Sequence, residues 1–337
     1  MRRGAARPNG GPLEGGLDQL FKADLHMHTR YSGPVKHLRL LRARDCYSQP
    51  LEVYRRAKQR GMDLVTITDH DSIDGCLELL NKLGDLPDFV IGEEVSAYLP
   101  WFRHTVHIGV FGHNEAQHRD IQRLRSNGEE VVEYLRRNNL LFVLNHFLHD
   151  FSNTARLHEF IERMAQLFDV FEVRNGTLQR EHNTFIVALL ERFRDRARPL
   201  GFVAGSDSHT LRRIGRVYTA SPARTREEFL RDIRQGRTQV FGPHSNHLSL
   251  AADIYGVVLR YYPTVLSIGN GEFHPLIRLR SLFLGIAFTP FLFTPYVAAV
   301  RHMRTERGRI KVFSRLLFGN QSHPSAPREV LRTGRIR

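Results

Sequence analysis

The chain has 337 residues, enough for one large domain or two smaller ones, and its 41% hydrophobic content is ordinary for a globular protein. The net charge of +14 lies mainly at the ends, with +10 in residues 276–337, +2 in residues 1–22 and only +2 between them. Two cysteines, Cys46 and Cys76, match no zinc-ribbon spacing. These features exclude a disulfide-rich secreted domain and a thiolate metal site.

We expect the two cysteines to be reduced thiols in a cytoplasmic protein. No apolar run follows Arg2, Arg3 and Arg7, so no secretory signal is visible, and the Gly-rich residues 1–21 are expected to be a flexible N-terminus. Basic ends of this kind contact nucleic acid or anionic membrane, or remain solvated.

From residue 22 onward, short apolar runs alternate with amphipathic stretches, which predicts an α/β fold. Strands are expected at 23–28, 64–68, 89–91, 106–111, 140–144, 170–173 and 202–204. Helices are expected at 50–60, 74–83, 115–138 with a break near Gly128, 157–167, 181–195 and 225–235. This order favours a barrel or a doubly wound sheet, and a barrel places its chemistry at the carboxyl ends of the strands.

Polar clusters follow or lie within these strands. His26 and His28, two residues apart on a strand, project to the same side and could chelate a metal ion. His70 follows the second strand, with Asp69 expected to orient it. Further candidates are Glu93 or Glu94, His107, His146, and the pair Asp207 and His209.

Any one of these histidines is more often structural than a ligand, but the joint pattern is difficult to obtain by chance. Imidazole mixed with carboxylate suits zinc, manganese or iron, and so many ligands predict two or three divalent ions. A multinuclear site activates a water and clamps phosphate oxygens, so phosphoester hydrolysis by a metal-bridged hydroxide is expected.

The chain resembles the polymerase-and-histidinol-phosphatase (PHP) family of metal-dependent phosphoesterases. Four motifs carry the resemblance: D-L-H-M-H-T at 24–29, T-D-H-D at 68–71, N-H at 145–146 and G-S-D-S-H at 205–209. G-E-E-V-S at 92–96 and V-H-I-G at 106–109 match two further family positions. The resemblance covers roughly residues 22–242 and implies a distorted (β/α)7 TIM-like barrel, expected over residues 22–243, with a trinuclear metal centre.

The resemblance also implies which residues bind metal. They are His26, His28, His70, Glu94, His107, His146, Asp207 and His209. Glu94 is chosen over Glu93 because the family pattern places one residue between Gly and Glu, and Glu94 is expected to bridge two ions. Asp69 and Arg174 are the expected catalytic residues.

One position departs from the family pattern. Where the family has an acid or a histidine after H-x-H-T, this chain has Gly33. Asp45 or His37 could supply the missing ligand from a longer loop, and Asp45 is favoured. Without either, the ion at His70 and His209 would be weakly held.

A phosphate substrate needs cationic partners besides the metal ions. Arg174 is the first candidate, and Arg103, His149 and Arg212 are the others. The expected substrate is a phosphorylated small molecule, a nucleotide or an oligonucleotide end. Amidohydrolase-like hydrolysis on the same metals, or a regulatory module that has lost catalysis, are the alternatives.

Residues 244–337 are expected to form a C-terminal extension. Its segment 281–300 contains no charged side chain but is interrupted by Pro290 and Pro295. Three interpretations remain open: a broken helix packed on the barrel, an interfacial membrane anchor beside a polybasic segment, and a true membrane span.

Overall fold

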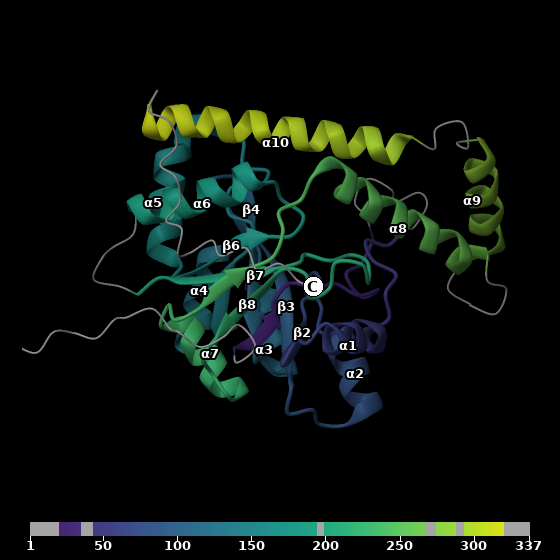
Figure 1. The fold of residues 1–337 in the computed structure, drawn as a ribbon, viewed down its shortest axis with the longest axis horizontal. Helices are drawn as coiled ribbons and strands as arrows, with labels where there is room; N and C mark the ends of the chain where they lie inside the picture. The colour runs from purple at the N-terminus through teal and green to yellow at the C-terminus, as the bar shows by residue number, and fades with distance from the viewer. Residues whose placement is uncertain (1–19, 35–42, 194–198, 267–273, 288–292, 320–337) are drawn as a thin grey trace, which may run out of the picture.

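A computed structural model describes residues 20–34, 43–193, 199–266, 274–287 and 293–319 (Figure 1). Its strands form one nine-stranded sheet in the order β7-β6-β5-β4-β3-β2-β1-β8-β9. They are β1 (Phe21–Asp24), β2 (Leu64–Ile67), β3 (Phe89–Leu99), β4 (His104–Phe111), β5 (Leu141–Leu144), β6 (Val170–Asn175), β7 (Gly201–Gly205), β8 (Tyr218–Ser221) and β9 (Gln239–Phe241).

The sheet is mixed, and it curls into a nearly closed barrel. β4 runs antiparallel to both of its neighbours, whereas β1, β2 and β3, and likewise β5, β6 and β7, pair in parallel. β1 and β7 meet just beyond their carboxyl ends, where Met27 bridges Ser208 and the Ser206 amide donates to Asp24 Oδ1 at 2.8 Å. The predicted α/β barrel is thus confirmed, with β4 as the one reversed strand among the first seven.

The helices lie mostly where the sequence pattern placed them. They are α1 (Pro50–Gln59), α2 (Asp74–Leu83), α3 (Glu115–Leu124), α4 (Gly128–Arg137), α5 (Leu157–Leu167), α6 (Arg180–Phe193), α7 (Arg226–Arg234), α8 (His247–Leu266), α9 (Pro275–Ala287) and α10 (Thr294–Phe318). A single 3-10 turn at Thr154–Arg156 precedes α5. The predicted helix at 115–138 is two helices, because Asn127 caps α4 through its side chain.

Strand boundaries differ more from the expectation. β3 was expected to end at Ile91 but continues to Leu99, because its register with β4 runs unbroken from Gly92 to Leu99. β1 was expected to reach His28 but ends at Asp24. β8 and β9 were not foreseen, since both are short and β9 has only three residues.

The C-terminal helix α10 is joined to the main core of the barrel domain. Its buried side chains Ile310, Phe313 and Leu317 belong to the same apolar cluster as the barrel residues around Phe151 and Phe185. In Figure 1, α10 crosses the molecule beside α6 at one end and α8 at the other. This stretch of the predicted extension therefore packs against the barrel.

The uncharged segment 281–300 falls on the end of α9 and the beginning of α10, and residues 288–292 lie outside the described part of the chain. Ser281 and Ala299 are buried in it. Among the described residues, no helix combines the length and apolar character needed to cross a bilayer. A peripheral contact of the tail with anionic membrane or nucleic acid stays a prediction.

Replacing Phe313 by alanine should lower the free energy of unfolding by about 3–5 kcal/mol, because its fully buried ring would leave a cavity in the core. Chemical denaturation of the whole chain measures this change. Val312→Ala is the matched control, since Val312 is next in the chain and 44% exposed. Equal stabilities of the two variants would show that α10 does not share the core.

Candidate metal centre

The carboxylate of Glu94 is the central group of the site. Glu94 is fully buried in β3, and each of its oxygens faces two imidazoles. Oε2 lies 3.2 Å from His26 Nε2 and 3.0 Å from His70 Nδ1. Oε1 lies 3.0 Å from His146 Nε2 and 3.3 Å from His107 Nδ1. A carboxylate placed in this way can bridge two cations.

Asp207 approaches the same group from the loop after β7. Its Oδ1 lies 3.3 Å from His28 Nε2 and 3.6 Å from His209 Nδ1. Its Oδ2 accepts hydrogen bonds of 3.1 Å from Asn175 and Thr177. The backbone of Asp207 has a φ of 49°, a left-handed conformation that non-glycine residues seldom adopt and that is often found at functional sites.

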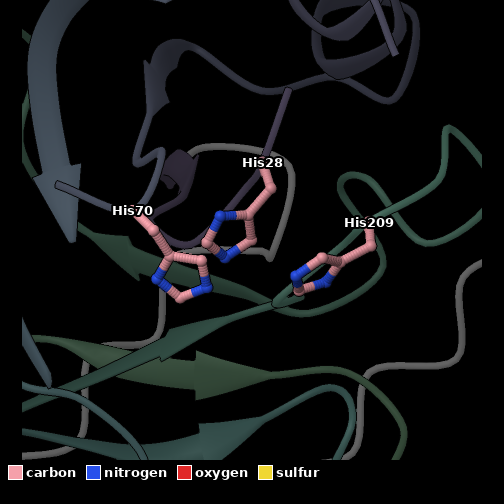
Figure 2. A group of neighbouring side chains, drawn as sticks. All are labelled: His28, His70 and His209. Atoms are coloured by element: carbon pink, nitrogen blue, oxygen red, sulfur yellow. The ribbon is translucent and has the colours of Figure 1, made fainter. Parts of the chain in front are cut away.

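Figure 2 shows the imidazoles of His28, His70 and His209 converging on one space. Asp45 lies beside two of these rings, with its Oδ2 atom 2.7 Å from His209 Nε2 and 3.5 Å from His70 Nε2. The loop returns Asp45 to the site because its amide donates to the carbonyl of Gly33, whose φ is 79°. Asp45 therefore occupies the place of the missing acid, and His37 lies outside the described residues.

The chemistry of these side chains fits bound cations. Several buried atoms face one another without any hydrogen-bond partner: His26 Nε2, His28 Nε2, His70 Nδ1, His107 Nδ1 and Glu94 Oε2. Buried polar atoms are rarely left unpaired, since each would cost free energy. Four overlapping sets of three side chains in this group are close enough to share an ion, which is consistent with a polynuclear metal site.

The electrostatics of Glu94 and His28 agree with this interpretation, whereas the facing carboxylates outweigh burial and raise the pKa of His26, His70 and His209. Burial alone would raise the pKa of Glu94, but the imidazoles of His26, His70 and His107 hold that pKa well below its ordinary value. Burial and the neighbouring rings of His209 and His70 lower the pKa of His28 to about 3. Both shifts favour the forms that bind metal, a charged carboxylate and a neutral imidazole.

A second layer of groups orients the ligands, and the sequence did not reveal it. Glu172 Oε1 lies 3.0 Å from His26 Nδ1, and Ser32 Oγ lies 2.9 Å from His28 Nδ1. Such partners fix which ring nitrogen faces the metal. The available signal for Glu172 was a single acid within an otherwise apolar strand, but Ser32 had none.

Asp69 acts differently from the expectation. It does not orient the His70 ring; instead its Oδ1 accepts from the Ser32 hydroxyl at 2.8 Å and from the Thr29 amide at 2.6 Å. Ser32 in turn contacts His28. Asp69 is fully buried, and its link to His28 through Ser32 supports a positioning role, whereas its catalytic role stays a prediction.

The predicted cationic residues divide into two groups. Arg103 and His149 line a cavity of ≈ 300 Å³ together with His107 and His146, so they adjoin the Glu94 group. Arg174 is fully buried and its Nη1 donates to the Gly242 carbonyl at 2.7 Å, while its Nε and Nη2 are buried without a hydrogen-bond partner, so its role in catalysis or substrate binding stays a prediction.

Two further predictions concern neighbouring side chains. Arg212 donates to Asp253 at 2.7 Å, which gives it a structural partner. Glu93 points to the opposite face of β3, where His113 Nε2 and His118 Nδ1 lie 3.0 and 2.9 Å from its Oε2. Glu94, and not Glu93, therefore faces the other predicted ligands, although Glu93, His113 and His118 are themselves close enough to share an ion.

Gly205 ends β7 next to His26. A Cβ atom at position 205 would lie only 2.2 Å from the Cβ of His26 and 2.8 Å from its backbone nitrogen. Contacts under 3.0 Å do not occur between real side chains and such atoms, so the two chain segments approach at a distance that only glycine permits.

Residues 192–238 match the family model described as PHP-associated. The matched stretch contains β7, β8 and α7 and includes Asp207 and His209. This part of the chain is similar to that family. The resemblance of the sequence to the PHP family is thereby confirmed.

One relative is similar to part of the chain. An uncharacterised protein of Methanocaldococcus jannaschii is 40% identical over 78 residues, which are 22% of this chain and 44% of that protein. The chain therefore spans less than half the length of this relative.

Three solved structures are also similar. An amidohydrolase from Chromobacterium violaceum has a TM-score of 0.45 and 18% identity, and the match covers 64% of this chain and 96% of that one. PsfC from Pseudomonas syringae has a TM-score of 0.46 and 17% identity, with 72% of this chain and 98% of that one covered. A candidate metal-dependent phosphoesterase from Bifidobacterium adolescentis has a TM-score of 0.39 and 16% identity, with 63% of this chain and 94% of that one covered.

Asp45→Asn should remove the ion held by His70 and His209 while leaving the ions beside Glu94 and Asp207. Metal content measured by elemental analysis should fall by about one ion per chain. The exposed Asp85, replaced in the same way, is the matched control. An unchanged metal content in Asp45→Asn would show that the ion at His70 and His209 does not need the Asp45 carboxylate.

Ser32→Ala should weaken metal binding by about 10–100-fold, because the Nδ1 atom of His28 loses the oxygen that orients it. Competition with a chelator of known affinity measures the change. Ser152→Ala, at an exposed serine, should bind as the parent does. An equal affinity in both variants would rule out the Asp69–Ser32–His28 chain as a positioning element.

Proposed function

We propose that this chain is a metal-dependent hydrolase that cleaves phosphoester bonds, with a phosphorylated small molecule, a nucleotide or a nucleic-acid end as substrate. One observation carries the proposal: the buried Glu94 carboxylate lies between two pairs of imidazoles, with Asp207 beside His28 and Asp45 beside His209. That combination of ligands suits two or three divalent ions such as zinc, manganese or iron.

The residues of the chain would perform separate tasks. His26, His28, His107 and His146, with Glu94, would hold ions at the mouth of the barrel, and the other ligands would complete the group. Bound ions would supply Lewis-acid activation of water and neutralise negative charge on the phosphate. Glu172 and Ser32 would keep His26 and His28 in the binding orientation.

The adjoining cavity fits a phosphate ester. Its volume is ≈ 300 Å³, and its lining includes the imidazoles of His104, His107, His146 and His149 as well as Arg103 at the rim. Nitrogen donors and a guanidinium are the partners that phosphate oxygens prefer. A small phosphomonoester or one terminal nucleotide is compatible with a space of this size.

His26→Ala and Asp207→Ala should each lower both metal content and turnover of p-nitrophenyl phosphate, the latter by about 100-fold or more, because each removes a ligand from the shared group. Protein stripped with a chelator and reloaded with zinc or manganese is the starting material. His158→Ala, at an exposed histidine of α5, is the matched control.

Two results would contradict the proposal. Full phosphatase turnover in either His26→Ala or Asp207→Ala would show that the assigned metal centre is not the active site. Metal-dependent cleavage of an aryl amide with no cleavage of the phosphate would keep the metal centre but make the chain an amidohydrolase.

A further inference from the structure

A second group of unpaired polar atoms lies beside the metal centre, where α10 covers the barrel. His149 follows β5, His182 begins α6, and Glu306 lies in the middle of α10. Glu306 and His182 are 3% and 2% exposed, so their polar atoms are shielded from solvent. We call these three side chains the α10 group. No residue of the PHP motifs belongs to it.

The tautomer of His182 leaves two acceptor atoms facing each other. Its Nε2 donates to the carbonyl of Phe147 at 3.0 Å, so in a neutral ring Nδ1 carries a lone pair. That Nδ1 lies 3.3 Å from Glu306 Oε2, which is also an acceptor. Neither atom has a hydrogen-bond partner. Two facing acceptors repel each other unless a positive centre lies between them.

His149 repeats the pattern on the other oxygen of Glu306. Its Nδ1 is buried without a hydrogen-bond partner and lies 3.5 Å from Glu306 Oε1. Two imidazole nitrogens and one carboxylate therefore converge, which is a ligand combination typical of zinc.

The distances in the α10 group are compatible with coordination, although two imidazole–carboxylate pairs of the Glu94 group are shorter, at 3.0 Å. The hydrogen-bonded group of Glu93, His113 and His118 has nitrogen–oxygen distances of 3.0 and 2.9 Å. In the α10 group they are 3.3 and 3.5 Å. Two ligand atoms on a tetrahedral zinc ion, each about 2.05 Å from it, are about 3.3 Å apart.

The outer partner of His182 also matches that of a metal ligand. A ligating histidine usually donates its second N–H to a carbonyl or carboxylate, and His182 does so to the carbonyl of Phe147. Arg309 donates to Glu306 Oε1, the oxygen nearer His149, and holds the carboxylate in place, while Oε2 faces His182.

We propose that His149, His182 and Glu306 form a further binding site for a divalent cation of the zinc class, and that α10 supplies its carboxylate. The His149 ring is 5.6 Å from that of His146, centroid to centroid, so the ion would lie next to the predicted substrate cavity. His302, one turn before Glu306 on the same face of α10, places another imidazole 5.5 Å from His149. The site does not depend on which bond the enzyme hydrolyses.

Glu306→Gln tests the site, because the amide keeps the shape of the side chain but loses its charge. The full chain is stripped, reloaded with zinc and dialysed, and zinc per chain is measured by elemental analysis. We expect the variant to hold about one ion fewer than the parent. Arg307 is the next residue of α10, and its side chain pairs with Glu181 of α6. Arg307→Gln is the matched control and should hold as much zinc as the parent.

The same loss should appear in a chain that already carries His26→Ala, since the two sites are separate. His149→Asn provides a second variant, because His149 is partly exposed and its replacement leaves the core intact. Cobalt loading gives an independent measurement, with visible absorption reduced in both variants. If zinc content is unchanged in Glu306→Gln and in His149→Asn, then a proton on His182 balances Glu306 and the proposal is wrong.

Discussion

The structure is organised around one buried negative charge. A carboxylate without solvent costs several kcal/mol unless positive or polarised groups surround it, and Glu94 is surrounded on both oxygens by imidazole nitrogens. The long β3 and the antiparallel β4 both contribute to this surrounding. Reversal brings the amino-terminal half of β4 to the mouth of the barrel, where His107 pairs with Ser96 across the two strands.

Much of this arrangement could be predicted from the sequence, because buried strands and metal ligands both leave local signals. The seven strands of the barrel follow from apolar runs, and most residues around Glu94 follow from family motifs. What sequence could not give are the contacts that form only after folding. Ser32 looks like an ordinary loop residue until Asp69 and His28 are placed on either side of it.

Arg174 shows a different limit of the sequence. An arginine expected directly after a strand of a barrel resembles a phosphate ligand, but Arg174 lies within β6, where the irregularity between Glu172 and Arg174 alters the side-chain alternation. One nitrogen of its buried guanidinium donates to the Gly242 carbonyl. A pattern of residue types predicts which face of a strand a side chain occupies only where the strand is regular.

The close approach at Gly205 has a consequence for mutational scanning of the G-S-D-S-H motif. Its glycine would ordinarily be interpreted as a hinge or a tight turn, yet the constraint is steric exclusion by the backbone and Cβ of His26. Even a single methyl group there would push a ligand-bearing segment outward. A substitution at this position would thus imitate the loss of a ligand while leaving every donor atom in the chain.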